Sequence, residues 1–213
     1  MFYTFLIILI FYPFASYARP ISYVGGTTLM QMNNADENML HVNYTFNPKA
    51  SAGIFSVYDK DEKYLANSVI LNNRLYRYNG DRSQVNLYLE NAVGQEHSYQ
   101  KEKKGKDGFY AMNGISADAE DRRFYGAYEA HYTHNDADIA KSYFEQKVRA
   151  GVAPYIGSSG DLHSWLILEL DHKPSKDDNF RLTPFVRFFK GDVLTEMGAN
   201  EDGDVMFNWI YRF

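Results

Sequence analysis

The strongest constraint on the fold of this chain is a period-two alternation of apolar and polar residues that returns along almost its whole length. The alternation is clearest in residues 205–213 (VMFNWIYRF), 142–153 and 161–171. Successive side chains of a β-strand point to opposite faces, so each run predicts a strand with one apolar and one mostly polar face. A helical period is hard to find after Ala18. The sequence therefore predicts an all-β fold.

Counting these runs gives about twelve strands, or ten if two weak runs are merged or dropped. Every second connection, beginning with the first, is charged and generally long, whereas most of the others are tight turns such as Asn79-Gly80-Asp81 and Lys190-Gly191-Asp192. The longer segment Pro154–Gly160 is the exception. The predicted strands cover residues 27–33, 38–46, 50–58, 64–77, 84–94, 108–117, 122–133, 142–153, 161–171, 179–189, 192–199 and 204–213.

Two folds fit this pattern. A soluble secreted β-sandwich turns its apolar face inward, whereas an outer-membrane barrel turns that face to lipid and keeps polar side chains inside. The aromatic content favours the barrel, because the chain has 18 Tyr and 15 Phe and a membrane barrel carries aromatic girdles near its strand ends. We therefore predict an antiparallel up-and-down transmembrane β-barrel. The girdle candidates are Tyr44, Phe46, Tyr76, Tyr78, Tyr88, Phe109, Tyr110, Phe124, Tyr125, Tyr132, Tyr143 and Phe144.

The first segment predicts export. Residues 1–18 (MFYTFLIILIFYPFASYA) are uncharged, almost wholly apolar, and end in Ser16-Tyr17-Ala18. This pattern is typical of a secretory signal peptide cleaved after Ala18, although the usual positive residues before the apolar run are missing. A membrane anchor is the alternative, but Pro13 interrupts a run that is shorter than the ~20 residues of a spanning helix. We expect a signal peptide (1–18) and one barrel domain (19–213).

The last strand resembles the C-terminal signal of Gram-negative outer-membrane β-barrel proteins. In that class the final strand alternates apolar residues and ends in an aromatic residue, as Trp209, Tyr211 and Phe213 do here. The resemblance implies location in the cell outer membrane and recognition by the barrel-insertion machinery. It also implies contact with outer-membrane lipid and lipopolysaccharide. The resemblance implies no particular activity, because it is to this class as a whole and not to a specific family.

A barrel of this size lies between eight-stranded barrels filled by side chains and porins with open channels. We expect a porin-like narrow channel for small solutes, or a filled structural barrel that presents charged surface loops. One charge of alternating sign is predicted to face inward on each of the last five strands. If these charges pair with one another, they make a polar interior tolerable and their role is structural. The alternative is a charge-lined eyelet that selects small solutes. This lumen set is Arg149, Glu169, Arg187, Glu196 and Arg212.

Methionine and histidine suggest a second function, copper handling or resistance. Met30, Met32, Met39 and His41 surround one predicted hairpin, and thioether and imidazole groups are ligands of copper. Strand parity places Met30 with Met32 on one face, and Met39 with His41 on one face. The alternative is that methionine fills apolar surface. His131, His134 and His163 are weaker candidates.

A lipid-modifying outer-membrane enzyme is the third and least favoured function. His163 and Ser164 are adjacent, so a strand turns them to opposite faces and they cannot form a nucleophile–base pair. His131 shares a face with Glu129, but parity gives it no serine partner. The common hydrolase, zinc-protease and nucleotide-binding motifs are absent from the sequence. We therefore predict no catalytic residues.

The remaining expectations concern partners. We expect no cofactor, and no nucleic-acid partner because the net charge is −5. The oligomeric state is left open. The segment Gln95–Asp107 holds Lys101, Lys103 and other charges, and predicts a solvated external loop. Contact of this loop with anionic lipopolysaccharide is an alternative.

Overall fold

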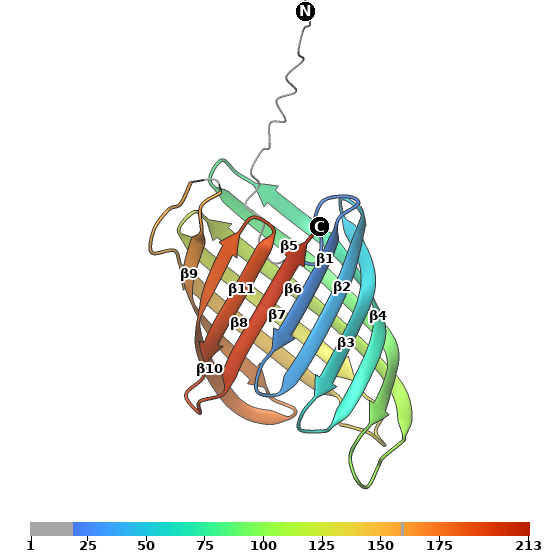
Figure 1. Ribbon diagram of the computed structural model, residues 1–213. Helices are drawn as coiled ribbons and strands as arrows, with labels where there is room; N and C mark the ends of the chain where they lie inside the picture. Colours follow the sequence, from blue (N-terminus) through green and yellow to red (C-terminus); the bar gives the residue numbers. More distant parts are fainter. Residues whose placement is uncertain (1–18, 159) are drawn as a thin grey trace, which may run out of the picture.

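In the described part of the chain, residues 19–158 and 160–213 of a computed structural model, twelve antiparallel strands close into a barrel (Figure 1). Each strand pairs with its neighbours in sequence, and the first pairs with the last. The up-and-down barrel is confirmed, and the soluble sandwich is wrong. The strands are β1 (Thr27–Asn33), β2 (Glu37–Asn47), β3 (Ala50–Asp59), β4 (Tyr64–Asn79), β5 (Ser83–Ser98), β6 (Asp107–Asp121), β7 (Phe124–His134), β8 (Tyr143–Val152), β9 (His163–Lys173), β10 (Asp177–Lys190), β11 (Val193–Ala199) and β12 (Val205–Arg212).

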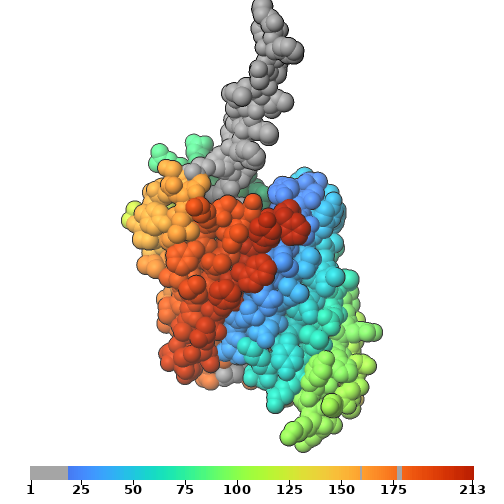
Figure 2. All heavy atoms as spheres, viewed as in Figure 1, coloured from blue at the N-terminus to red at the C-terminus, as the bar shows by residue number. Residues whose placement is uncertain are grey.

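The outer face of the barrel is apolar. Val69 is 64% exposed and Leu166 53%, and each lies between two buried residues that face the lumen; Ile54 is 58% exposed next to buried Phe55. Figure 2 shows the barrel wall as unbroken from β10 across the β12–β1 closure to β3, and the exposed hydrophobic residues on these strands include Leu182, Val193 and Tyr211. A contiguous apolar surface of this kind is unfavourable in water and is the lipid-facing band of a membrane barrel. No helix in the described residues is long and apolar enough to cross a membrane.

The C-terminal strand completes the barrel wall. Thr27 N donates to Phe213 O over 2.7 Å, and Phe213 N donates to Thr27 O over 3.0 Å. Tyr211 and Phe213 are exposed on the outer face, and Trp209 shares their parity. The role of these residues in membrane insertion stays a prediction. The predicted signal peptide, residues 1–18, lies outside the described residues.

The barrel has two distinct ends. We call the end at which β1 begins and β12 finishes the terminal end, and the opposite end the loop end. The longest connection, 153–162, lies at the terminal end, so the two ends differ less in loop length than the sequence predicts. Gly191 occupies a tight turn with φ of 60°, a conformation that glycine adopts without steric cost. The connections at the loop end are 34–36, 60–63, 99–106, 135–142, 174–176 and 200–204.

The wall of the barrel is uneven in height. Strands β4, β5 and β6 have 16, 16 and 15 residues, whereas β11, β12 and β1 have 7, 8 and 7. The hairpin of β5 and β6 therefore projects beyond the rest of the barrel at the loop end (Figure 1). The strands predicted over 84–94 and 108–117 are too short, because regular pairing continues into the charged segment as far as His97 and Asp107.

The aromatic girdle is confirmed only in part. Tyr44, Phe109 and Phe124 are among the candidates exposed on the outer face, but Tyr88, Tyr110 and Tyr143 are buried in the lumen. The physical reason is parity: of two adjacent rings such as Phe109 and Tyr110, only one can face lipid. In this pair the tyrosine faces the lumen, where its hydroxyl is hydrogen-bonded to Thr133. The other exposed candidates are Phe46, Tyr76, Tyr78 and Tyr132, whereas Tyr125 also faces inward and Phe144 is half-buried.

The inner face has an apolar half and a charged half. The apolar half is a cluster from β3 to β6 that includes Phe55, Val57 and Tyr110, and it is covered by Ile139 of the β7–β8 connection. The charged half lies mainly on β7 to β11. Side chains therefore fill much of the barrel, and the free space between the two halves is the candidate site.

Candidate functional site in the lumen

Four of the five predicted lumen charges form two pairs along one wall, which we call the wall cluster: Arg149, Glu169, Arg187 and Glu196. The strand register places Arg149 opposite Glu169 and Arg187 opposite Glu196. Arg149 Nε lies 2.6 Å from Glu169 Oε2, and Arg187 Nε lies 2.7 Å from Glu196 Oε1. Glu169 and Arg187 are not opposite each other, because Glu169 pairs with Thr183. The wall therefore holds two separate ion pairs rather than one chain of charges.

Further contacts satisfy the buried groups of the wall cluster. Arg187 and Glu196 are 2% and 3% exposed, and Asn208 Nδ2 donates to Glu196 Oε2 over 2.8 Å. The guanidinium of Arg187 lies over the ring of Tyr125, 4.5 Å from its centroid. Burial of a charge is tolerated when it is paired and hydrogen-bonded. These contacts make the wall cluster a structural lining of the lumen.

The fifth predicted lumen charge, Arg212, faces inward but lies apart from the wall cluster. Asn208, and not Arg212, stands opposite Glu196 in the register. Arg212 is 6% exposed, and its Nε and Nη2 atoms have no hydrogen-bond partner among the described residues. It contributes positive charge at the terminal end of the lumen.

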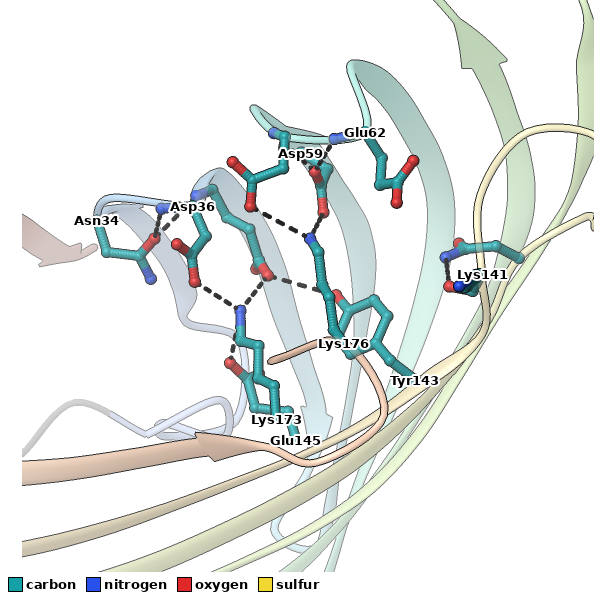
Figure 3. Close-up of polar contacts among 12 residues, drawn as sticks. Asn34, Asp36, Asp59, Glu62, Lys141, Tyr143, Glu145, Lys173 and Lys176 are labelled. Carbon is teal, nitrogen blue, oxygen red and sulfur yellow. Dashed lines mark hydrogen bonds and ion pairs between the residues drawn. The ribbon is translucent and has the colours of Figure 1, made fainter. Parts of the chain in front are cut away.

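A second charged group, which the sequence does not predict, closes the loop end. We call it the loop-end cluster: Asp36, Glu37, Glu145, Lys173 and Arg181. Lys173 Nζ lies 3.1 Å from Asp36 Oδ2, 2.8 Å from Glu37 Oε1 and 3.0 Å from Glu145 Oε1. Arg181 Nη1 adds a contact of 2.7 Å to Asp36 Oδ2. Figure 3 shows Lys173 reaching these carboxylates from β9.

The contact of Lys173 with Glu145 joins the neighbouring strands β8 and β9, but other contacts of the loop-end cluster cross the lumen. In the ring of strands, β2 lies opposite β8 and nearly opposite β9, yet Glu37 of β2 contacts Lys173 of β9. It also accepts a hydrogen bond of 3.3 Å from the hydroxyl of Tyr143 on β8. Beside them, Lys176 Nζ lies 2.6 Å from Asp59 Oδ2. These side chains bridge opposite walls and narrow the loop end.

Asp36 titrates as expected for a carboxylate held by two cations. Burial alone would raise its pKa, but the charges of Lys173 and Arg181 outweigh that effect, so the pKa of Asp36 lies below its ordinary value. Asp36 belongs to the connection between β1 and β2, outside the strands that span the membrane. It is therefore ionised at neutral pH and keeps its contacts.

The β7–β8 connection also folds over the loop end. Ile139 is fully buried against the apolar half of the lumen. Asp136 N donates to Glu96 Oε1 over 2.6 Å, and Lys103 Nζ donates to Ile139 O over 3.0 Å. The connection is thus fixed to the β5–β6 hairpin and narrows the opening beside the loop-end cluster.

At the terminal end, the residues before β1 lie in the mouth of the barrel. Arg19 is 6% exposed, and its guanidinium contacts Asp118 at 2.8 Å, Glu120 at 2.7 Å and the side chain of Gln84. Ser51 Oγ donates to Pro20 O over 2.8 Å. This segment narrows the terminal end.

Between these two constrictions lies a cavity of about 170 Å³. Its lining runs from Arg19 and Asp118 at the terminal end to Asn34 and Glu37 at the loop end, and includes all four residues of the wall cluster. A space of this volume holds several water molecules. The lumen thus holds a narrow space whose lining reaches both ends of the barrel and combines charged side chains with apolar ones such as Met112 and Ile210.

The methionine and histidine candidates all line this cavity. The register of β1 and β2 places Met30 opposite His41 and Met32 opposite Met39, so the four side chains share the inner face. Within residues 19–158 and 160–213, no three His, Asp or Glu residues are grouped to hold a metal ion.

His131 forms no nucleophile–base pair with a serine, whereas Ser142 Oγ lies 3.5 Å from His134 Nδ1 at the exposed loop end. His131 Nε2 lies 3.3 Å from Glu90 Oε2, while Ser116 Oγ donates to Glu90 Oε1 over 2.7 Å. Glu90 therefore separates the serine from the imidazole, whereas serine catalysis requires their direct contact. Ser164 Oγ lies 3.0 Å from the hydroxyl of Tyr155. Glu129 shares the inner face with His131, as predicted, but lies 3.6 Å from Arg149 Nη1.

Solved structures resemble this barrel. The chain matches a structure of the KdgM porin with a TM-score of 0.50 and 9% identity, over 88% of this chain and 98% of that chain. The chain has the fold of that porin. A structure of the KdgM porin with disordered oligogalacturonate matches with the same values. At such identity the likeness shows the fold alone. Together with the apolar outer face, this fold places the barrel in the outer membrane.

Acinetobacter baumannii OccAB2 is a weaker match, with a TM-score of 0.41 and 12% identity over 87% of this chain and 59% of that chain. No protein-family model and no curated protein matches the sequence.

Proposed function

We propose that this protein is a narrow outer-membrane channel for small polar solutes, and that the loop-end cluster is its main constriction. The observation that carries the proposal is the cavity whose lining runs from Arg19 to Glu37 and includes the charged side chains of the wall cluster. A filled structural barrel has no need of such a space. A channel needs it, together with a constriction that selects what passes.

The charges of the lining fit small polar solutes better than one sign of ion. Arg149 and Arg187 are matched by Glu169 and Glu196, and at the loop end Lys173 is matched by Asp36 and Glu37. Mixed and mutually paired charges give a polar surface with little net field, whereas strongly ion-selective pores carry rings of one sign. We therefore expect weak ion selectivity and passage of small polar solutes. Oligogalacturonate, present in the KdgM complex, is one solute to test.

Single cysteine variants test whether the lumen conducts. The chain has no cysteine, so one introduced thiol is the only target for a charged, water-soluble methanethiosulfonate reagent. Ala127 lines the cavity, and Ala150 is exposed on the outer face. We expect the reagent to reduce the ion current of Ala127→Cys in planar bilayers and to leave that of the matched control Ala150→Cys unchanged.

Two results would contradict the channel. Absence of current from folded wild-type protein and from Lys173→Ala, in which the contacts of Lys173 at the loop end are lost, would indicate a filled barrel. Equal inhibition of Ala127→Cys and Ala150→Cys would show that the current does not pass through the lumen. Heat-modifiable migration in gels verifies folding of each variant.

Activity as an enzyme is not part of the proposal. The fold is that of a porin, and Ser116 is separated from His131 by Glu90.

We also propose that the C-terminal residues Trp209, Tyr211 and Phe213 engage the insertion machinery. Lipopolysaccharide is the proposed partner of the projecting β5–β6 hairpin.

A further inference from the structure

The methionines of this barrel lie on the unexpected face. The described residues contain six of the chain's seven methionines. Five of them line the lumen, and only Met197 is exposed on the outer face. If methionine served only as apolar filler, a membrane barrel would place it toward lipid. Three of the lumenal methionines, Met30, Met32 and Met39, lie on a single hairpin.

The hairpin of β1 and β2 brings three thioethers and one imidazole together. Met30 is directly opposite His41, and Met32 is directly opposite Met39. Opposite residues on one face of an antiparallel pair have Cβ atoms about 4.5–5.5 Å apart. The long, flexible methionine side chains can therefore converge with the imidazole on one ligand.

His41 is the unsatisfied member of this group. It is 8% exposed, the centroid of its ring lies 4.4 Å from that of the tilted Phe55 ring, and its Nε2 atom has no hydrogen-bond partner among the described residues. In contrast, the Nε2 atom of His131 is hydrogen-bonded to Glu90. A buried polar atom without a partner is costly. A bound cation would supply the missing partner for the lone pair of a neutral imidazole.

The ligand types restrict the ion. Thioether sulfur is a soft ligand that favours Cu(I), whereas Ca²⁺ and Mg²⁺ need oxygen ligands and structural Zn²⁺ sites use thiolate, imidazole or carboxylate groups. The site has three thioethers, one imidazole and no carboxylate of its own. All four groups are neutral as ligands, which suits a monovalent ion in a barrel interior.

We propose that Met30, Met32, Met39 and His41 form a lumenal binding site for a soft monovalent cation, Cu(I) or Ag(I). The site lies next to the loop-end cluster, because Met39 follows Glu37 by two residues on the same face of β2. Its occupancy does not depend on whether the barrel conducts solutes. Direct binding therefore tests it separately from the channel.

The experiment uses Ag(I), which is soft, monovalent and stable in air. Folded barrel in detergent is labelled with ¹³C at the methionine methyl groups and titrated with silver nitrate in chloride-free buffer. We expect the signals of Met30, Met32 and Met39 to shift and to saturate near one equivalent. The signal of Met197 is the internal control and should remain unchanged at that point.

A matched variant then tests the ligands. Met30→Leu with Met39→Leu keeps side-chain volume, so the barrel should fold, and Ag(I) affinity should fall by more than the ~10-fold seen when a group supporting a metal ligand is lost. Met112→Leu with Met206→Leu changes two other lumenal methionines and should bind as the wild type does. Equal shifts at all methionine signals, or unchanged affinity after the first double substitution, would overturn the proposal. The wild-type titration remains decisive if a variant fails to fold.

Discussion

The two charged clusters of the lumen differ in what they connect. The wall cluster joins neighbouring strands: Arg149 to Glu169 across β8 and β9, and Arg187 to Glu196 across β10 and β11. The loop-end cluster also joins opposite walls, because Lys173 of β9 contacts not only Glu145 of the adjacent β8 but also Glu37 of β2. A contact between neighbours stabilises the wall and leaves the lumen free. A contact between opposite walls occupies the path of a solute.

This difference predicts that substitutions in the two clusters have different effects on the protein. Breaking the wall cluster should mainly reduce stability, and breaking the loop-end cluster should mainly increase conductance. The following substitutions test that division, from the largest expected effect to the smallest.

Glu196→Ala should be the most destabilising change. It leaves the guanidinium of Arg187, which is 2% exposed, without its carboxylate, and loss of one partner of a buried pair costs about 3–5 kcal/mol. Unfolding in guanidinium chloride, followed by tryptophan fluorescence in lipid vesicles, measures the change. Asp107→Asn, which breaks the exposed contact with His97, is the control and should cost far less. Similar stability of the two variants would refute a structural role for the wall cluster.

Lys176→Ala should have a smaller effect. Its partner Asp59 has a fully buried side chain, but the carboxylate also accepts hydrogen bonds from Asp61 N at 3.0 Å and Glu62 N at 2.7 Å. The loss should approach the ~1.5–3 kcal/mol of a hydrogen bond to a charged group. The same unfolding assay measures it, and a loss as large as that of Glu196→Ala would contradict this order.

Acidification should weaken the loop-end cluster only at low pH. The pKa of Asp36 is lower in the folded protein than the ~3.9 of a free aspartate. Its stabilising contribution is therefore complete above that pH and is lost as the pH falls through the folded pKa. We expect the conductance of the wild type to rise as the pH falls below about 4. The conductance of Asp36→Asn should show no such rise, because the asparagine side chain does not titrate. A wild-type rise already between pH 7 and 5 would show that another group controls the constriction.

Tyr143→Phe should have the smallest effect. It removes the hydrogen bond of 3.3 Å to Glu37 but keeps the ring, so the expected loss of stability is about 0.5–1.5 kcal/mol. Glu37 retains its contact with Lys173, and conductance should change little. A large increase in conductance would mean that the tyrosine, and not the ion pair, closes the loop end.

Period two was sufficient to predict that the strands exist and that the wall cluster faces inward, but not which tyrosines face lipid. Each run of alternation forms a strand, and Arg149, Glu169, Arg187 and Glu196 all face the lumen because parity in a strand is fixed by geometry. The ends of β5 and β6 were not predictable from polarity, because charged residues near their tips pair as regularly as apolar ones.

The loop-end cluster could not be predicted because its members are far apart in sequence and meet only across the closed barrel. Glu37 and Lys173 are separated by 136 residues, and their contact depends on how the ring of strands brings β2 and β9 face to face. Their inward parity was the available signal, since Glu37 shares the face of Met39 and Lys173 that of Glu169. Strand ends that carry inward charges deserve inspection in other barrels of this size.

Single-channel conductance of Lys173→Ala tests the central claim most directly. This substitution removes the three contacts of Lys173 with Asp36, Glu37 and Glu145. The matched control is Lys106→Ala, because Lys106 contacts Asp138 at 3.6 Å and both side chains are more than half exposed. We predict a severalfold larger conductance for Lys173→Ala than for wild type, with Lys106→Ala unchanged. Equal conductance of all three folded proteins would contradict a constriction at the loop-end cluster.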